Sequence, residues 1–266
     1  MQISGPFNIQ FLSKNNEIKV IECNLRASRS LPFVSKTFNV NFVELATKVM
    51  IGAPVKAGQI DLVDVDYVCM KVPMFSFTRL QGADPVLRVE MASTGEVACF
   101  GPTQHEAFLL GLLSTNFKLP AKNILVSAGP LSSKVEFLEA AQQLVKMGYS
   151  LFGTPGSAAF YKQHGLPITA LQKPAKKQLE AKGGDSKEDG GKDTADSVLA
   201  MLRSKRIDLV INIPHSNDVL ELTQGYHIRR TAVDFAIPLI CNIKAATLFV
   251  DALSRIRDKH FQFTIK

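Results

Sequence analysis

The chain has 266 residues and a mass of 29.1 kDa, with 46% hydrophobic and 21% charged residues and a formal net charge of +7. This composition excludes wholesale disorder, and the length predicts two modest domains rather than a single large one. The apolar runs are far shorter than the roughly 18 residues that cross a bilayer, and the basic residues are scattered, so we expect no membrane span and no nucleic-acid partner.

The first half of the chain predicts a hairpin, helices and further strands. The expected elements are strands at 7–12 and 18–23, a helix at 42–50, strands at 67–72 and 96–100, and a helix at 103–113. Asn41 with Glu44, and Thr103 with Glu106, have the spacing of a capping box, and Gly52 is placed to end the first helix. Residues 116–122 predict a linker.

After the linker the pattern changes to a regular alternation of strands and helices. The expected strands are 123–127, 150–153, 167–171, 208–213 and 239–243, and the expected helices are 133–147, 157–164, 195–204, 230–235 and 245–257. Such alternation predicts a parallel sheet covered on both faces, with ligands bound at the carboxyl ends of its strands. A polar insert at 173–193 predicts a surface loop.

The cysteines and histidines show no spacing typical of a site. Cys23, Cys69, Cys99 and Cys241 are too far apart for a zinc site or a disulfide framework. We therefore expect reduced, buried thiols in an intracellular protein. No Ser, Cys and His arrangement indicates a nucleophilic triad.

The hairpin carries a candidate metal site. Glu22 and Asn24 are two residues apart on one strand and share a face, and a turn centred on Asn16 places Gln10 across from Glu22. One carboxylate and two amide oxygens suit Mg²⁺ or Mn²⁺. Arg26 and Arg29 follow, with guanidinium groups suited to phosphate. The alternative is the solvated face of an exposed hairpin.

A second candidate site lies where a strand passes into a helix at residues 153–157. The hydroxyls of Thr154 and Ser157 and the first backbone N–H groups of the helix are placed to bind an anion. The alternative is that both side chains only cap the helix.

Several runs closely resemble carbamoyl-phosphate synthetase. Residues 5–11 (GPFNIQF), 20–29 (VIECNLRASR) and 32–36 (PFVSK) resemble the closing strands of its second ATP-grasp unit, and 91–97 (MASTGEV) resemble the segment that follows. Residues from about 123 onward resemble its C-terminal allosteric domain, which has a methylglyoxal-synthase-like (MGS-like) fold.

The resemblance implies an α/β chain in two parts. Residues 1–115 would be the C-terminal part of the α+β ATP-grasp unit and a following helical segment, 116–122 a linker, and 123–266 a Rossmann-like MGS-like domain with a parallel sheet. The family places the nucleotide-holding parts of the ATP-grasp unit upstream. We therefore expect this chain to be catalytically incomplete alone and to work with the remainder of the synthetase and a glutamine amidotransferase unit.

The resemblance also implies roles in the phosphorylation of carbamate by ATP. Gln10, Glu22 and Asn24 would be ligands of the Mg²⁺ or Mn²⁺ ions that bridge ATP phosphates. Arg26 and Arg29 would stabilise the charge that moves onto the acceptor.

In the second part, family similarity puts effector contacts at Thr154, Ser157, Lys173 and Asn212. Relatives that bind N-acetylglutamate carry Trp at the position of Lys173 and Asn at the position of His215. These departures favour a phosphorylated effector such as a uridine nucleotide. The run 229–232 (RRTA) is shared with the family and predicts at least one structural arginine.

Two other functions remain open from the sequence. One is a stand-alone anion-sensing or nucleotide-sensing module, and the other a lyase of the methylglyoxal-synthase type, for which no catalytic carboxylates can be placed. Residues 148–151 and 237–253 are nearest to the multifunctional pyrimidine-pathway type, with arginine or urea synthesis as the alternative. We expect a cytoplasmic location, with the mitochondrial matrix as the alternative; the nitrogen source, glutamine or ammonia, stays open.

Overall fold

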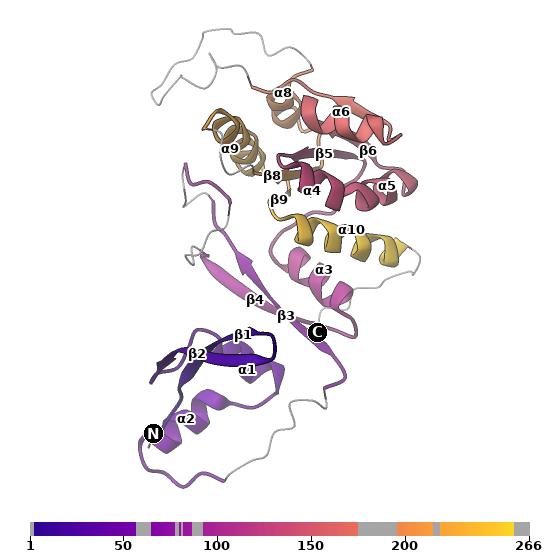
Figure 1. Cartoon of the computed structure of the whole chain (residues 1–266). Helices are drawn as coiled ribbons and strands as arrows, with labels where there is room; N and C mark the ends of the chain where they lie inside the picture. The colour runs from indigo at the N-terminus through magenta and orange to yellow at the C-terminus, as the bar shows by residue number, and fades with distance from the viewer. Residues whose placement is uncertain are drawn as a thin grey trace.

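The computed structural model describes residues 3–56, 65–77, 80, 82–86, 93–174, 196–214 and 219–257, except for the side chains of 219–222 and 257. Within these residues the chain forms a hairpin with two helices, a second strand pair, and a five-stranded sheet with its helices (Figure 1). The elements alternate in the second half as the sequence predicts, so the expected α/β class is confirmed.

The predicted hairpin is confirmed as an antiparallel pair of β1 (Asn8–Lys14) and β2 (Glu17–Asn24). Asn15 and Asn16 connect the strands with φ of 52° and 61°. Two consecutive residues with positive φ form the kind of two-residue turn that matches the twist of the strands, and asparagine tolerates this conformation.

Two short helices follow the hairpin. α1 (Leu31–Thr37), which the sequence analysis missed, has a proline in its first turn. α2 (Phe42–Met50) has the predicted bounds: Asn41 Oδ1 accepts a hydrogen bond from the Glu44 backbone N–H at 3.0 Å. Gly52 ends it with φ of 71°, in the left-handed region that glycine adopts without strain.

The second strand pair is antiparallel and consists of β3 (Val68–Met74) and β4 (Gly95–Gly101). The helix that follows, α3 (Gln104–Ser114), has Thr103 as its N-cap, as predicted. α3 packs on β3 and also contributes the fully buried Leu109 to the core beneath the five-stranded sheet. The domain boundary at 116–122 stays a prediction, and α3, which precedes it, shares the core of the second half.

The five-stranded sheet is parallel throughout, with the strand order β7-β6-β5-β8-β9. Its strands are β5 (Asn123–Ala128), β6 (Ser150–Gly153), β7 (Ile168–Ala170), β8 (Leu209–Ile213) and β9 (Leu239–Ile240). Its helices are α4 (Leu131–Glu136), α5 (Leu138–Lys146), α6 (Pro155–Gln163), α8 (Val198–Arg203), α9 (Val219–Asp234) and α10 (Ile243–Arg257).

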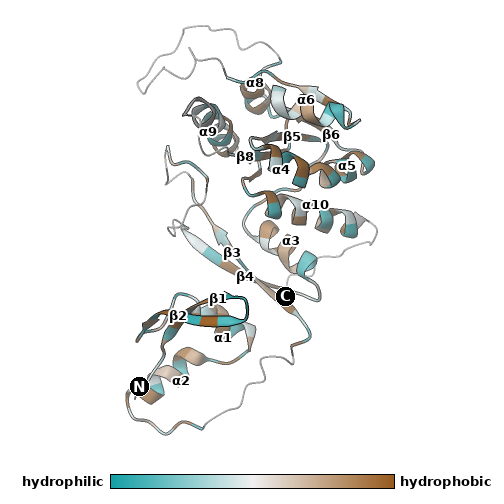
Figure 2. Ribbon diagram, viewed as in Figure 1, coloured by the Kyte–Doolittle hydropathy of each residue, from teal (hydrophilic) through white to brown (hydrophobic). Residues whose placement is uncertain are grey.

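Alternate residues of β5 enter two separate cores. Ile124 and Val126 pack in the core shared with α5, α6 and α10, while Leu125 packs in the core shared with α8 and α9. Figure 2 shows mixed hydrophobic and hydrophilic residues along α5 and α10, as expected of helices with one buried face. The predicted covering of both faces of the sheet is confirmed.

Three predicted boundaries are wrong. Ser133 does not cap a helix: α4 begins after Pro130, and the buried Phe137 separates α4 from α5. α9 begins at Val219 rather than near 230, because its polar side chains find partners in the tertiary structure. β9 is only two residues long, because Asn242 Oδ1 accepts from Ala245 N–H at 3.0 Å and starts α10.

Other predictions meet the structure as follows. All four cysteines are free, as expected, but each is partly exposed rather than buried. Most of the insert at 173–193 lies outside the described residues. Among the described helices, none has the length and apolar character needed to cross a membrane.

Candidate functional site

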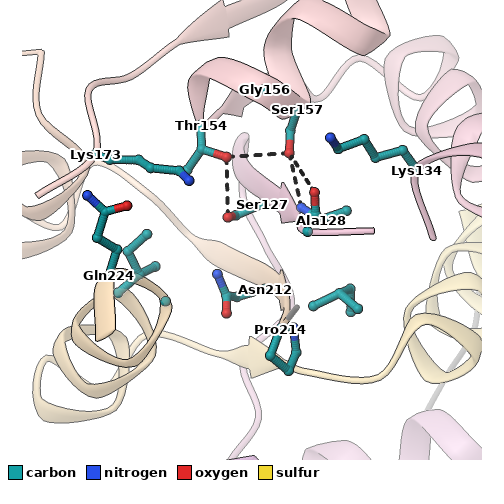
Figure 3. A pocket seen from close by; sticks show the side chains of 14 residues that line it. Ser127, Ala128, Lys134, Thr154, Gly156, Ser157, Lys173, Asn212, Pro214 and Gln224 are labelled. Carbon is teal, nitrogen blue, oxygen red and sulfur yellow. Dashed lines mark hydrogen bonds between the residues drawn. The ribbon is translucent and has the colours of Figure 1, made fainter. Parts of the chain in front are cut away.

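A small polar pocket lies at the carboxyl ends of β5, β6 and β8, the edge at which parallel sheets bind ligands (Figure 3). It encloses about 60 Å³. The polar side chains that line it include Ser127, Lys134, Thr154, Ser157, Lys173 and Asn212. All four residues predicted as effector contacts, Thr154, Ser157, Lys173 and Asn212, therefore meet in one place.

The hydroxyls of Thr154 and Ser157 form a buried cluster at the start of α6. The two residues are 3% and 1% exposed. Ser157 Oγ accepts from Ala128 N–H at 3.1 Å and donates to the Ala128 carbonyl at 3.2 Å, while Thr154 Oγ1 lies 3.3 Å from Ser127 Oγ. Thr154 occupies the N-cap position, but its side chain makes no capping hydrogen bond. The first turn of α6 is therefore not capped by its own hydroxyls, which leaves the helix N-terminus attractive to an anion.

Two lysines reach this helix end from different elements. Lys134 belongs to α4 and Lys173 follows β7. Lys134 Nζ lies 3.8 Å from the point where a β-carbon on Gly156 would stand, so the lysine reaches the first turn of the helix. Within the described part of the chain, Lys134 Nζ has no hydrogen bond or ion pair. The sequence analysis missed Lys134; its place just after the carboxyl end of β5 is the signal that could have found it.

Asn212 is held at the end of β8 by Arg229, which is 1% exposed. Arg229 Nη1 donates to Asn212 Oδ1 at 2.8 Å. A guanidinium group has only donors, so the Asn212 oxygen faces Arg229 and its amide nitrogen is free to donate into the pocket. The predicted structural arginine of residues 229–232 is thereby confirmed.

The pocket thus gathers donors and positive charge around the start of one helix. Lysine ammonium groups, a hydroxyl, an amide nitrogen and helix N–H groups are the partners that phosphate oxygens accept from. Among the described residues that line it, none carries a carboxylate. The arrangement is suited to binding a compact anion.

The hairpin brings Gln10, Glu22 and Asn24 together on one face. Gln10 is paired with Glu22, and Asn24 Nδ2 donates to Glu22 Oε1 at 2.9 Å. The turn lies between Asn15 and Asn16 rather than on Asn16, so an unbroken ladder would place Ile21 opposite Gln10. A bulge at Ile21 shifts the register and restores the predicted pair.

The donor set of this hairpin fits a hard cation. It offers a carboxylate with two amide side chains on an exposed face, and hard cations take such oxygens. Among the described residues, no group of three His, Cys, Asp or Glu side chains could hold a metal. A metal at the hairpin would therefore depend on the amides as much as on Glu22.

Arg26 and Arg29 lie directly after β2 and are both exposed. Arg26 Nη1 donates to the Ala27 carbonyl at 3.3 Å. Figure 1 shows the hairpin and the pocket-bearing sheet toward opposite ends of the molecule. The two predicted groups of site residues therefore form two separate sites, and the role of each residue stays a prediction.

The five-stranded sheet belongs to an MGS-like domain: the family model for that domain matches residues 136–241. Over 97% of its length the chain is 51% identical to the multifunctional protein pyr1-3 of Dictyostelium discoideum. It is 44% identical over 97% of its length to the multifunctional protein CAD of Squalus acanthias, and 46% identical over 96% to the human mitochondrial carbamoyl-phosphate synthase [ammonia].

Over nearly its whole length the chain is homologous to a segment of these multifunctional proteins and carbamoyl-phosphate synthases, and the predicted resemblance to the C-terminal portion of the synthetase large chain is confirmed. It spans 11%, 11% and 16% of the lengths of the three relatives. A solved methylglyoxal synthase from Elizabethkingia anophelis NUHP1 matches 50% of this chain and 79% of its own at 15% identity, with a TM-score of 0.34.

Proposed function

We propose that the chain is the C-terminal part of a carbamoyl-phosphate synthase large chain and that its MGS-like domain binds a phosphorylated effector, a uridine nucleotide, at the start of α6. The observation that supports this proposal is the convergence of Lys134 and Lys173 on the buried hydroxyls of Thr154 and Ser157. Each charged donor strengthens the attraction of an anion to the positive end of the helix dipole.

The donor set favours a phosphate over a single carboxylate. A phosphate presents three terminal oxygens and up to two charges, which match two ammonium groups and several N–H and O–H donors. N-Acetylglutamate, the effector of relatives with tryptophan at position 173, carries its negative charge on two separate carboxylates. A pocket that gathers its donors around one helix end matches the single compact charge of a phosphate better.

Calorimetric titration of the full chain with uridine monophosphate, inorganic phosphate and N-acetylglutamate tests this proposal. Uridine monophosphate is expected to bind most tightly, and Lys173→Ala and Thr154→Val are expected to weaken it. Lys162→Ala is the matched control, since Lys162 is an exposed lysine on α6 outside the pocket. Equal binding by wild type, Lys173→Ala and Thr154→Val would refute the pocket.

We further propose that the hairpin supplies metal ligands for ATP-dependent phosphorylation of carbamate. Gln10, Glu22 and Asn24 would hold Mg²⁺ or Mn²⁺, which neutralises charge on the phosphates of ATP, and Arg26 and Arg29 would contact phosphoryl oxygens. The support is the bulged register that pairs Gln10 with Glu22. Electron paramagnetic resonance of Mn²⁺ with the full chain should show weaker binding for Glu22→Gln and no change for Glu17→Gln, at the far end of the hairpin.

The small share of its relatives that the chain spans supports the further proposal that the synthetase activity requires more than these residues. The remainder of the synthetase and a glutamine amidotransferase unit are the proposed partners, in a cytoplasmic enzyme of pyrimidine synthesis. Assay of the chain alone for ATP-dependent synthesis of carbamoyl phosphate should show no turnover; robust turnover would contradict incompleteness. The alternative is a stand-alone anion-sensing module. Such a module would bind the effector, but adding it to a synthetase that lacks this segment would not change the activity of that synthetase.

A further inference from the structure

Arg229, which holds Asn212, is itself held by a residue from the connection between β3 and β4. Arg229 Nε donates to Asp84 Oδ1 at 2.8 Å, and Nη2 donates to Asp84 Oδ2 at 2.6 Å. The pair is bidentate, and the guanidinium is 1% exposed while the Asp84 side chain is 32% exposed. A buried guanidinium needs such a partner, because an uncompensated buried charge is strongly unfavourable.

The same arginine stands directly behind the pocket. A β-carbon on Gly225, which lines the pocket, would lie 2.8 Å from Arg229 Nη1. Arg229 is therefore in contact with two parts of the wall, the backbone of α9 at Gly225 and the side chain of Asn212. Asp84 does not line the pocket.

The segment that carries Asp84 makes further hydrogen bonds with α9. Tyr226 Oη donates to the Gly82 carbonyl at 2.8 Å, and Arg230 Nη1 donates to the carbonyls of Leu80 and Ala83 at 3.1 and 3.3 Å. Figure 1 shows the described part of the β3–β4 connection extending toward α9. The N-terminal half of the chain thus contacts the helix that lines the pocket.

The orientation of the Asn212 amide depends on this pair. As long as Arg229 points its donors at Asn212, the oxygen must face the arginine, and the nitrogen points into the pocket, as Figure 3 shows. An Asn212 amide released from Arg229 could turn its oxygen toward the ligand, where it would repel an anion. Charged partners also polarise a hydrogen-bonded chain, so each bond strengthens the next.

We propose that Asp84 is a positioning residue for the pocket: through Arg229 it fixes the Asn212 amide, and anion binding is therefore linked to the docking of residues 82–84 on α9. This inference rests on the proposed anion-binding function. Linkage is reciprocal, so a bound anion also holds residues 82–84 more firmly against α9.

The first test measures affinity. In calorimetric titration of the full chain with uridine monophosphate, Asp84→Asn should weaken binding by about tenfold, a coupling of ordinary size. In the background of Asn212→Ala, Asp84→Asn should have no further effect, because its route to the ligand is gone. The control is Asp66→Asn, the same change at an exposed aspartate that lies outside the pocket and outside residues 82–84. Unchanged affinity in Asp84→Asn, or an equal loss in both backgrounds, would overturn the proposal.

The second test measures hydrogen exchange at the amides of residues 82–84, and one of its two arms needs no ligand. Asn212→Ala should speed this exchange in the free protein, and uridine monophosphate should slow it in the wild type. If the wild type binds no uridine monophosphate, the proposed function fails, while the Asn212→Ala arm still decides the link between Asn212 and the segment. If exchange is the same in Asn212→Ala and wild type, that link is refuted. This arm decides the question even if Asp84→Asn does not fold.

Discussion

Lys134 and Gly156 face each other across the pocket: Lys134 Nζ lies 3.8 Å from the position that a β-carbon on Gly156 would occupy. Gly156 stands in the first turn of α6, where the helix dipole favours negative charge. The lysine thus points at the place where a ligand anion and the positive helix end would meet.

Gly156→Asp should fill the anion site from within. A carboxylate at this position would pair with Lys134 and stabilise the first turn of α6, so the free protein should be as stable as wild type or slightly more stable. Uridine monophosphate should then bind at least tenfold more weakly, measured by calorimetry. Gly156→Ala, which adds a β-carbon at ordinary contact distance, should bind as wild type does; equal binding by the Asp and Ala variants would contradict the assignment.

Ser157→Ala should destabilise the fold as well as the pocket. The Ser157 hydroxyl is 1% exposed and bonds both polar groups of Ala128, so its removal strands a buried N–H and a buried carbonyl. We expect a loss of about 1–3 kcal/mol in the free energy of unfolding, measured with urea. Ser133→Ala is the control: since Ser133 caps no helix, that change should fall within about 0.5 kcal/mol.

Gly111→Ala should weaken the attachment of α3 to β3. A β-carbon on Gly111 would lie 2.4 Å from Val72 Cγ2, too close unless the Val72 side chain or its strand moves. We expect about 1–3 kcal/mol of destabilisation in spite of the better helix propensity of alanine. Adding Val72→Ala should relieve the clash and recover part of the lost stability. Gly95→Ala should have little effect on stability, because the space around Gly95 is open. If the stability losses of Gly111→Ala and Val72→Ala simply added in the double variant, this packing would be contradicted.

His227 should make stability depend on pH on the acid side. Burial lowers the pKa of His227 in the folded chain. Below the unfolded pKa of about 6.5, the unfolded chain takes up a proton that the folded chain resists, so the free energy of unfolding falls as the pH falls. His227→Gln should lose less stability than wild type between pH 7 and pH 5 in urea titrations. Parallel curves for the two proteins would refute the effect.

Local signals predicted the parts of the fold that local forces determine. The caps at Asn41 and Thr103 were predictable because each depends on residues three positions apart. Ser133 and Glu136 have the same spacing yet form no cap, because packing of Phe137 in the core divides the helix there. The wrong helix start placed Lys134 within a predicted helix at 133–147, so the sequence analysis did not consider it as a residue near the end of a strand.

Contacts between distant segments were beyond such signals. Asp84 and Arg229 are 145 residues apart, and no periodicity relates them. The pairing of Gln10 with Glu22 was predicted correctly, but from a turn centred on Asn16 rather than between Asn15 and Asn16. The bulge at Ile21 compensates for this error. Thr154 and Ser157 were placed at a possible anion site by the junction of strand and helix, whereas Lys173 and Asn212 came from the resemblance to the synthetase family. The structure brings all four to the same strand ends, and their roles as effector contacts stay predictions.

The most direct measurement of the central claim is a crystal structure of the full chain grown with uridine monophosphate. We predict the phosphate at the start of α6, within hydrogen-bond distance of Lys134 Nζ, Thr154 Oγ1 and the Asn212 amide nitrogen. A nucleotide bound elsewhere, with this pocket unchanged and filled by solvent, would contradict the account.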